Sequence, residues 1–446
     1  MMYELPDPIE FGEPARLLPV LKEVNKEDRA TSILLGTFRG VPLFAKDLLE
    51  SIGQRIGTRN KIQCFSQVVL KEPKEGKLRP DGLIIIEKPK GAWLTMIESK
   101  VGSANIEKEQ ILSYVELAKK NNIDAIVTIS NEFSALPSHH PIKFAVNEKK
   151  KIEIYHWSWL DILTKALLLQ DSDEIKDTTQ KFLLAEFIRF FEHEASGVKG
   201  FTQMNPEWKD VVLKVQNGTI LRKQAEETIN TVAAWHQESR DLSLILSREL
   251  NVIVKEKLTK KHAKLPEARI KDDADRLVSD TELCSVFDVP DAASEISVVA
   301  NLSRRSLTCS MVLPAPEDRK TNKSQITWLL KQLSKTTDAS LFVRAWFKGS
   351  PLSSHASLEE LLNEPELLIL EGKEKVLFSR FEIATTLDLA GKFSGSKVFI
   401  QQLESLVPSY YANIGQYLRA YVKPAPKPQA WVSEPAETFS NVPAGE

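Results

Sequence analysis

Cysteine is scarce in this chain of 446 residues. The three cysteines, Cys64, Cys284 and Cys309, lie far apart in the sequence. They therefore form neither the framework of a small disulfide-rich protein nor the close spacing of a cysteine metal site. This usage fits a reducing compartment, and we expect a cytoplasmic protein.

Long hydrophobic runs are also missing. No stretch approaches the roughly 18 consecutive apolar residues that a membrane-spanning helix needs. The N-terminal letters MMYELPDPIEFGE are acidic and lack the apolar centre of a signal peptide. We therefore expect a soluble protein that has no membrane partner.

An excess of one charge sign is the third absence. Lys and Arg total 59 against 61 Asp and Glu, which gives a net charge of -2. Overall charge thus supplies no attraction to nucleic acid, and any such binding has to come from local patches. What the chain does have is a globular composition, 42% hydrophobic and 27% charged. Its length predicts two or three domains.

The first 166 residues alternate between helical and strand patterns. Their order is helix, β-meander, helix, strand, strand and helix, which predicts an α/β domain with a mixed sheet covered by helices. The expected helices are 26–56 and 105–122, and the expected strands are 61–70, 81–87, 92–100 and 123–130, with 151–167 a strand running into a closing helix.

Strand patterns vanish over 167–270, and this part is predicted to be a helical linker or dimerisation region. They return over 271–423 with interspersed helices, which predicts a separate α+β domain for target recognition, dimerisation or a protein partner. The final segment, 424–446, is rich in Pro and Ala and is predicted to be disordered.

Charged residues stand at unusual places in the stretch RPDGLIIIEKPKGAWLTMIESK, residues 79–100. Glu98 and Lys100 are two apart in an apolar strand, so they share one face at roughly 6.6 Å along the strand. Asp81 opens the preceding strand, at a separation that suits neighbours in a hairpin. Charges are seldom buried without partners, which favours a site over chance placement.

Two carboxylates at a strand end are hard oxygen ligands of the kind that Mg²⁺ prefers. Such an ion activates water and stabilises charge on a phosphate. A neighbouring lysine could orient the attacking water, or assist proton transfer if its pKa is depressed. These are the parts needed to hydrolyse a phosphodiester.

A simpler interpretation exists for each residue taken alone. Asp81 follows Pro80 and could be a turn residue, and Glu98 with Lys100 could be a solvated ion pair of little energetic weight. Glu-x-Lys recurs elsewhere in the chain. The combination favours a catalytic set: an acid opens one apolar strand, Glu-x-Lys ends the next, and a helix follows directly.

The pattern Pro-Asp, a gap and then Glu-x-Lys resembles the PD-(D/E)XK nuclease superfamily, over about residues 20–165. The resemblance implies a restriction-endonuclease-like mixed sheet flanked by helices. It also implies that Asp81 and Glu98 hold Mg²⁺, for which Mn²⁺ can substitute, and that Lys100 serves the attacking water. The remainder of the chain resembles no family that we recognise.

The resemblance extends to two helices. Many members carry a further metal-binding glutamate on the first helix, a role for which Glu27 is the first choice here and Glu50 the fallback. Without the resemblance, a glutamate in a first turn is also explained by the helix dipole. Some branches carry a Gln-x3-Tyr pair on the helix after the lysine, which Gln110 and Tyr114 match as substrate-positioning residues.

Basic residues surround the acidic stretch in the sequence. Lys77 and Arg79 lead into the first acid, and Lys88 and Lys90 occupy the predicted hairpin turn. They could form a rim that contacts a nucleic-acid backbone, although a solvated loop explains them equally well. The pair His139 and His140 in LPSHHPIK is expected in a surface loop rather than as metal ligands.

We therefore expect a metal-dependent nuclease, a hydrolase of phosphodiester bonds that acts on DNA. By analogy alone, prokaryotic antiviral defence or DNA repair would suit it. Cutting both strands commonly uses two sites, which suggests a homodimer. The alternative is a catalytically silent nuclease-fold scaffold that binds nucleic acid or a protein partner. The sequence leaves open whether DNA or RNA, ends or interior bonds, are attacked.

Overall fold

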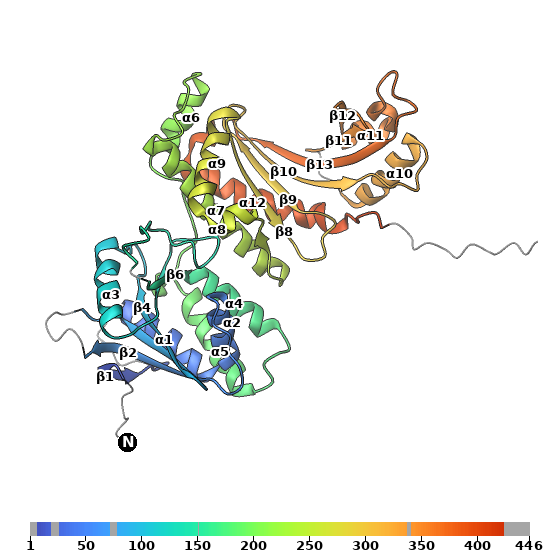
Figure 1. Ribbon diagram of the computed structural model, residues 1–446. Helices are drawn as coiled ribbons and strands as arrows, with labels where there is room; N and C mark the ends of the chain where they lie inside the picture. Colours follow the sequence, from blue (N-terminus) through green and yellow to red (C-terminus); the bar gives the residue numbers. More distant parts are fainter. Residues whose placement is uncertain (1–6, 19–25, 72–77, 150, 337–339, 423–446) are drawn as a thin grey trace, which may run out of the picture.

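The computed structural model describes residues 7–18, 26–71, 78–149, 151–336 and 340–422. These residues form two units, each built on its own β-sheet with helices packed against it (Figure 1). The protein is thus an α/β protein with one mixed and one antiparallel sheet. The expectation for the Pro- and Ala-rich segment 424–446 lies outside the described residues. No helix in the described ranges is long and apolar enough to cross a membrane.

The first sheet has six strands arranged in chain order. Their bounds are β1 Ile9–Pro14, β2 Lys61–Leu70, β3 Gly82–Lys88, β4 Gly91–Ser99, β5 Ala125–Ser130 and β6 Glu153–Ser158. The strands from β1 to β4 run antiparallel, and β4, β5 and β6 run parallel. The mixed sheet predicted from the sequence is confirmed. β1 was not foreseen, because its six residues IEFGEP show no clear alternation.

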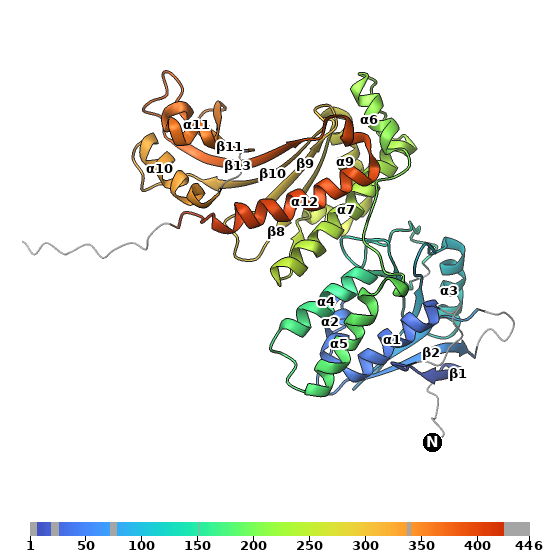
Figure 2. The ribbon, with the colours of Figure 1, turned by 180° about the vertical axis from the view of Figure 1, so that it is seen from behind.

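Helices cover both faces of this sheet (Figures 1 and 2). One layer contains α1 Lys26–Gly40, α2 Pro42–Ser51, α4 Trp159–Asp171 and α5 Thr178–Glu192, and the other contains α3 Lys108–Lys120. β3 shows how the sheet serves both layers. Ile84 and Ile86 belong to the core beneath the four helices, whereas Leu83 and Ile85 belong to the core beneath α3. Period-two alternation thus explains why β3 is apolar throughout.

The first core extends beyond the domain boundary predicted at residue 166. Phe187 and Phe191 of α5 are buried in it, with Phe187 5.1 Å from Phe44 and Phe191 stacked 4.9 Å from Trp159 between ring centroids. Helical periodicity predicted α5, but periodicity does not say against which core an apolar stripe packs. The first unit therefore includes α5.

The second sheet has seven strands in the order β12-β11-β13-β10-β9-β8-β7, all antiparallel. Their bounds are β7 Lys255–Glu256, β8 Glu282–Asp288, β9 Ile296–Asn301, β10 Ser306–Pro314, β11 Leu341–Phe347, β12 Ser353–Ser357 and β13 Phe378–Asp388. The helices are α6 Trp208–Gln216, α7 Glu226–Leu250, α8 Lys260–Lys264, α9 Pro266–Ser279, α10 Asn322–Gln332, α11 Leu358–Asn363 and α12 Ser396–Asn413. Short 3₁₀ turns lie at Glu194–Ser196, Leu333–Lys335, Pro365–Leu368, Ala390–Ser394 and Gly415–Tyr417.

The helical middle of the chain is not a separate region. α7 contributes Trp235, Leu242 and Leu246 to the core of the second sheet, together with residues of α6 and α12. The apolar side chains of this region are therefore buried within the chain. The boundary predicted at residue 270 falls inside α9, in which Arg269, Ala274 and Leu277 are buried.

The two units meet where α4 lies beside α7 (Figures 1 and 2). Arg240 of α7 donates to Asp161 of α4 at 2.7 Å, and Arg248 donates to Thr164 at 2.9 Å. The segment that leaves the first unit is held by α7, since the backbone N–H of Phe201 donates to Asp241 Oδ2 at 2.6 Å. Polar contacts of half-buried and buried side chains thus fix one unit against the other.

Candidate active site

The hairpin of β3 and β4 brings the predicted acids to one end of the sheet. Gly82 pairs with Ile97 in this hairpin, so Asp81, just before β3, lies beside the end of β4. Asp81 Oδ2 accepts from the backbone N–H of Ser99 at 2.7 Å and from its hydroxyl at 3.2 Å. The Ser99 hydroxyl also lies 2.7 Å from that of Thr31 on α1. A side chain from the first helix thereby supports the carboxylate.

Glu98 is buried, with 2% of its surface exposed, and its carboxylate is fully engaged. Oε1 accepts from Lys100 Nζ and from Gln110 Nε2, each at 2.7 Å, and Oε2 accepts from the Tyr114 hydroxyl at 2.9 Å. Gln110 and Tyr114 are one turn apart on α3 and so share a face. A buried carboxylate is tolerated when it is paired and hydrogen-bonded, which explains the charge inside an apolar strand.

Lys100 lies between two carboxylates. Its Nζ is 2.7 Å from Glu98 Oε1 and 3.5 Å from Glu27 Oε2, and its side chain is 16% exposed. Burial alone would lower the pKa of Lys100, but the hydrogen bond and charge of Glu98, with the charge of Glu27, outweigh it and raise the pKa. Lys100 is therefore protonated at neutral pH. Of the two roles open to it, orienting water is favoured over accepting a proton.

Asp81 titrates far from the usual range of a carboxyl group. Burial and then the negative charge of Glu98 raise the pKa of Asp81 to about 8, against the lowering effects of the Ser99 N–H and Lys100. Asp28 of α1 adds a smaller raising effect. The two strand-end acids thus repel each other, and a cation between them would relieve that repulsion.

The fit of a divalent cation is partial. Within the described ranges, no three His, Cys, Asp or Glu side chains are grouped so that they could hold a metal. Glu27, predicted as the third ligand, contacts Lys100 instead. Glu50 is exposed, and its charge acts on Asp47 rather than on Asp81. Asp81 and Glu98 remain as a two-carboxylate set, which is enough for Mg²⁺ when water and substrate phosphate complete its shell.

Gln110 and Tyr114 were predicted to position substrate, and the structure places both on Glu98. Burial and the nearby charge of Glu98 raise the pKa of Tyr114, so its hydroxyl stays neutral and can donate. Gln110 Nε2 also lies 3.3 Å from that hydroxyl. The pair therefore orients the Glu98 carboxylate, while contact with substrate remains a prediction.

The basic rim predicted around the acids is not assembled as expected. Lys88 pairs with Gly91 at the far end of the hairpin, and its Nζ donates to Gln54 at 3.0 Å. Lys90 lies in the same turn, which the 7 residues of β3 separate from Asp81. Arg79 is near the site and donates to Gln67 at 2.7 Å, whereas Lys77 lies outside the described residues. Strand direction separates residues that are close in sequence.

The backbone after Lys100 is tied to the end of the first unit. The N–H of Gly102 donates to the carbonyl of Gly197 at 2.9 Å. The side-chain amide of Asn131 donates to the carbonyl of Gly102 at 3.0 Å and to that of Gly197 at 2.8 Å. Gly197 has φ +78°, and a Cβ there would lie 2.9 Å from Gly102 N. Trp159 also donates to Lys100 O at 2.9 Å. Sequence reasoning missed these positioning residues, since the two glycines are 95 positions apart in no recognisable motif.

Ser99 was also missed, although it stands inside the motif. Strand alternation puts its side chain on the face opposite Glu98. Asp81 lies before its strand begins, and its carboxylate reaches the Ser99 side of the strand end. The motif Glu-Ser-Lys thus supplies the carboxylate of Glu98, the hydrogen-bond donor to Asp81 and the amine of Lys100.

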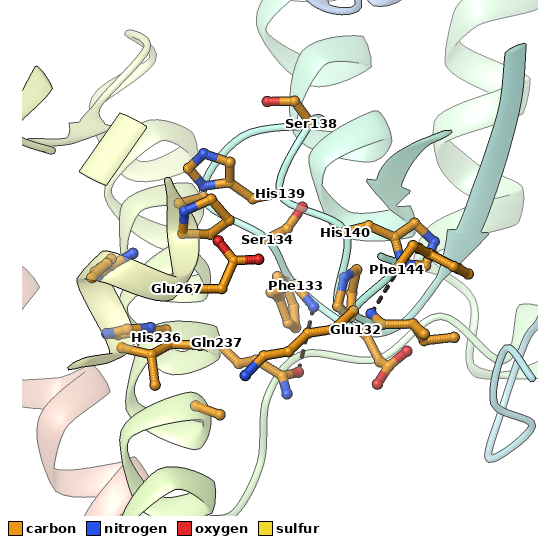
Figure 3. A pocket seen from close by; sticks show the side chains of 18 of the residues that line it. Glu132, Phe133, Ser134, Ser138, His139, His140, Phe144, His236, Gln237 and Glu267 are labelled. Atoms are coloured by element: carbon orange, nitrogen blue, oxygen red, sulfur yellow. Dashed lines mark hydrogen bonds between the residues drawn. The ribbon is translucent and has the colours of Figure 1, made fainter. Parts of the chain in front are cut away.

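A cavity of about 200 Å³ lies at the junction of the two units, and neither Asp81 nor Glu98 lines it (Figure 3). The loop after β5 lines one side, and α7 and α9 line the other. His139 is 9% exposed and contacts the carbonyl of Ala263 at 2.9 Å, so its side chain packs against the second unit, whereas the neighbouring Ser138 is exposed as expected for a surface loop. Burial lowers the pKa of His140 to about 3, and its ring nitrogens bond Thr128 and the Ile142 N–H.

The arrangement combines the carboxylates of Asp81 and Glu98, which repel each other, with the protonated amine of Lys100. Polar side chains donate hydrogen bonds to both carboxylates. Carboxylates are oxygen ligands of the kind that Mg²⁺ prefers, and a protonated amine can offset negative charge on a phosphate. No protein-family model, curated protein or solved structure matches the chain, so the interpretation of this site depends on its geometry and chemistry.

Proposed function

We propose that the first unit is a metal-dependent nuclease of the PD-(D/E)XK type, with a restriction-endonuclease-like fold, and that DNA is its substrate. The observation that supports this most directly is the convergence of Asp81, Glu98 and Lys100 at one end of β3 and β4. The six-stranded mixed sheet with helices on both faces agrees with the proposed fold. A role in prokaryotic defence or DNA repair is proposed from analogy alone.

Asp81 and Glu98 are the residues that would hold the cation. When bound, Mg²⁺ or Mn²⁺ would lower the pKa of a coordinated water and stabilise negative charge on the scissile phosphate. Lys100, held protonated by Glu98, would hydrogen-bond the attacking water and offset the charge of the phosphate. Gln110 and Tyr114 hold the Glu98 carboxylate in one orientation, and Ser99 does the same for Asp81.

The experiment uses the full chain with single- and double-stranded DNA and RNA, in EDTA and with Mg²⁺ or Mn²⁺. Asp81→Asn and Lys100→Ala remove one acid and the amine. Lys90→Ala is the matched control, because Lys90 lies on the same hairpin at its far end. We expect cleavage by the unmodified protein and by Lys90→Ala, and a loss of about 100-fold or more in the other two.

Cleavage retained by both Asp81→Asn and Lys100→Ala, with all variants folded by circular dichroism, would remove the proposal. The second candidate is a silent scaffold, favoured by one observation: every oxygen of Glu98 already accepts a hydrogen bond. Binding of nucleic acid that needs no metal, without cleavage of any of the four substrates, would support the scaffold.

A further inference from the structure

The second sheet carries a cluster of aromatic and basic side chains on its outer face. On β11 the residues Leu341, Val343, Ala345 and Phe347 are buried in the core, which also contains residues of α10, α11 and α12. Alternation directs the intervening residues Phe342, Arg344 and Trp346 to the other face, where each is half-buried. The outer face is thus the side of the sheet away from this core.

Trp346 lies close to two guanidinium groups. The Arg380 guanidinium carbon is 4.6 Å from the centroid of the Trp346 ring, and that of Arg344 is 5.8 Å from it. The register explains the first contact, since Trp346 pairs with Arg380 across β11 and β13. A guanidinium within about 6 Å of an indole face is a cation–π contact, which holds both planar groups in place.

The neighbouring strand adds further positive or titratable groups. His355 of β12 pairs with Arg344 and is exposed, and Lys348 is exposed just after β11. Glu382, which pairs with Arg344 across β11 and β13, is an acid within this patch and lies 3.5 Å from Arg344. The acids Glu282 and Asp288 belong to β8, which is four strands from β11 in the sheet order. Positive charge on this face therefore gathers at the β11–β12 edge.

The spacing of the two aromatic residues suits unpaired bases. Phe342 and Trp346 are four positions apart on one face of β11, which is about 13 Å along a strand, with Arg344 between them. Exposed aromatic rings stack bases of any sequence, while arginines between them contact the phosphates. Paired bases in a duplex present only their edges, so this combination matches single strands better.

We propose that the outer face of β11, β12 and the first half of β13 is a binding site for single-stranded nucleic acid. Trp346 and Phe342 would stack on bases, and Arg344, Arg380 and Lys348 would contact the backbone. The inference deepens the proposed function, because it names the substrate form that the second unit would deliver to the first. Its binding step needs no metal, and it can be tested even if the chain cuts nothing.

The test measures the affinity of the full chain for a fluorescent 20-nucleotide single strand in EDTA, by anisotropy. Because stacking contributes about 1–3 kcal/mol per base, we expect Trp346→Ala to weaken binding by about 5- to 150-fold. Trp346→Phe keeps a ring and should stay within about 3-fold. Arg380→Ala should weaken binding and reduce the slope of log K against log salt by about 0.7, the value for one phosphate on a single strand.

Phe182→Ala and Arg189→Ala are the matched controls, since both residues are exposed on α5 in the first unit. They should bind as the unmodified chain does. The inference fails if Trp346→Ala and Arg380→Ala bind normally, if a duplex of equal length binds as tightly as the single strand, or if polyglutamate competes as well as the oligonucleotide.

The same measurements separate this inference from the proposed function. Phe182→Ala should both bind the single strand and cleave as the unmodified chain does, because Phe182 is exposed on α5 and belongs to neither site. Metal-dependent cleavage without any effect of Trp346→Ala on binding would remove the inference and leave the nuclease. Binding that depends on Trp346, without cleavage by any form of the chain, would support the single-strand site and remove the proposed nuclease activity.

Discussion

Tyr114 and Glu98 are 16 positions apart in the chain and are joined by a 2.9 Å hydrogen bond. The tyrosine comes from the helix that covers one face of the first sheet, and the glutamate comes from the strand beneath it. This bond links the helix to the carboxylate on which the proposed chemistry depends. It also makes the helix part of the site rather than only a cover for the core.

Replacement of Tyr114 by Phe should cost stability as well as activity. It leaves Glu98 Oε2 buried without its donor, and a buried unsatisfied acceptor costs about 1–3 kcal/mol. We expect the free energy of unfolding in urea to fall by that amount and metal-dependent cleavage to fall with it. Tyr155→Phe is the matched control, because the Tyr155 hydroxyl donates to the exposed Glu153 at 2.6 Å. Its loss should cost no more than about 0.5 kcal/mol. Equal losses in the two variants would contradict the role of Tyr114.

The stability of the metal-free protein should fall as pH rises toward 8. The pKa of Asp81 is about 8 in the folded protein and about 3.9 in an unfolded chain. Between these values the folded state binds a proton that the unfolded state does not, so raising the pH favours unfolding. We expect the Tm in EDTA to drop between pH 5.5 and pH 8.5 by more in the unmodified protein than in Asp81→Asn. An excess drop of about 2–4 °C would correspond to about 1 kcal/mol.

Addition of Mg²⁺ should reverse this drop. A cation that binds the ionised carboxylates stabilises the folded state by mass action, and it does so more at pH 8.5 than at pH 5.5 because protons compete at the lower pH. Asp81→Asn should show little response at either pH. The pair of carboxylates would not be a cation site if Mg²⁺ raised the Tm of both proteins equally.

The contact of Gly197 with Gly102 should be sensitive to a single methyl group. Gly218→Ala is the control, because Gly218 has a similar φ of +70° but an added Cβ would meet nothing within 4 Å. That control isolates the cost of a left-handed alanine, about 1–2 kcal/mol. Gly197→Ala should be less stable than the control and should lower cleavage further, since it displaces the backbone two residues after Lys100. Equal stability and activity of the two variants would show that the contact does not matter.

The ion pair between Arg240 and Asp161 should hold the two units together. Their side chains are 16% and 10% exposed, and removing one partner leaves a largely buried charge, at a cost of about 3–5 kcal/mol. We expect Arg240→Ala to lower the free energy of unfolding toward that amount. Arg189→Ala breaks an exposed pair with Glu186 and should cost about 0–1 kcal/mol. Denaturant unfolding of both variants provides the comparison, and a small effect of Arg240→Ala would mean that apolar packing alone secures the junction.

The acids and the lysine were predictable because two local rules place them. Period-two alternation puts Glu98 and Lys100 on one face, and the short turn between β3 and β4 fixes the pairing that brings Asp81 alongside. The match of α3 to a Gln-x3-Tyr pattern likewise pointed to Gln110 and Tyr114. Their bonds to Glu98 were not predictable, because they depend on how the helix sits on the sheet.

Other features depended on tertiary contacts that no local pattern encodes. The hairpin lysines were expected beside the acids because they are near in sequence, yet strand direction carries Lys88 to the far end. The boundary predicted at residue 270 falls inside α9, half of whose residues are charged, because burial of Arg269 against Glu256 uses that charge inside the structure. The metal role of Glu27 came from the resemblance, and its side chain reaches Lys100 instead.

The packing of α5 determines how the chain can be shortened. A fragment that ended at residue 166 would leave Phe44 and Trp159 facing water, since their partners Phe187 and Phe191 would be gone. It would also lose Gly197, the acceptor that anchors the strand-end backbone. A working fragment of the first unit therefore has to run at least through Val198, which packs against the same core.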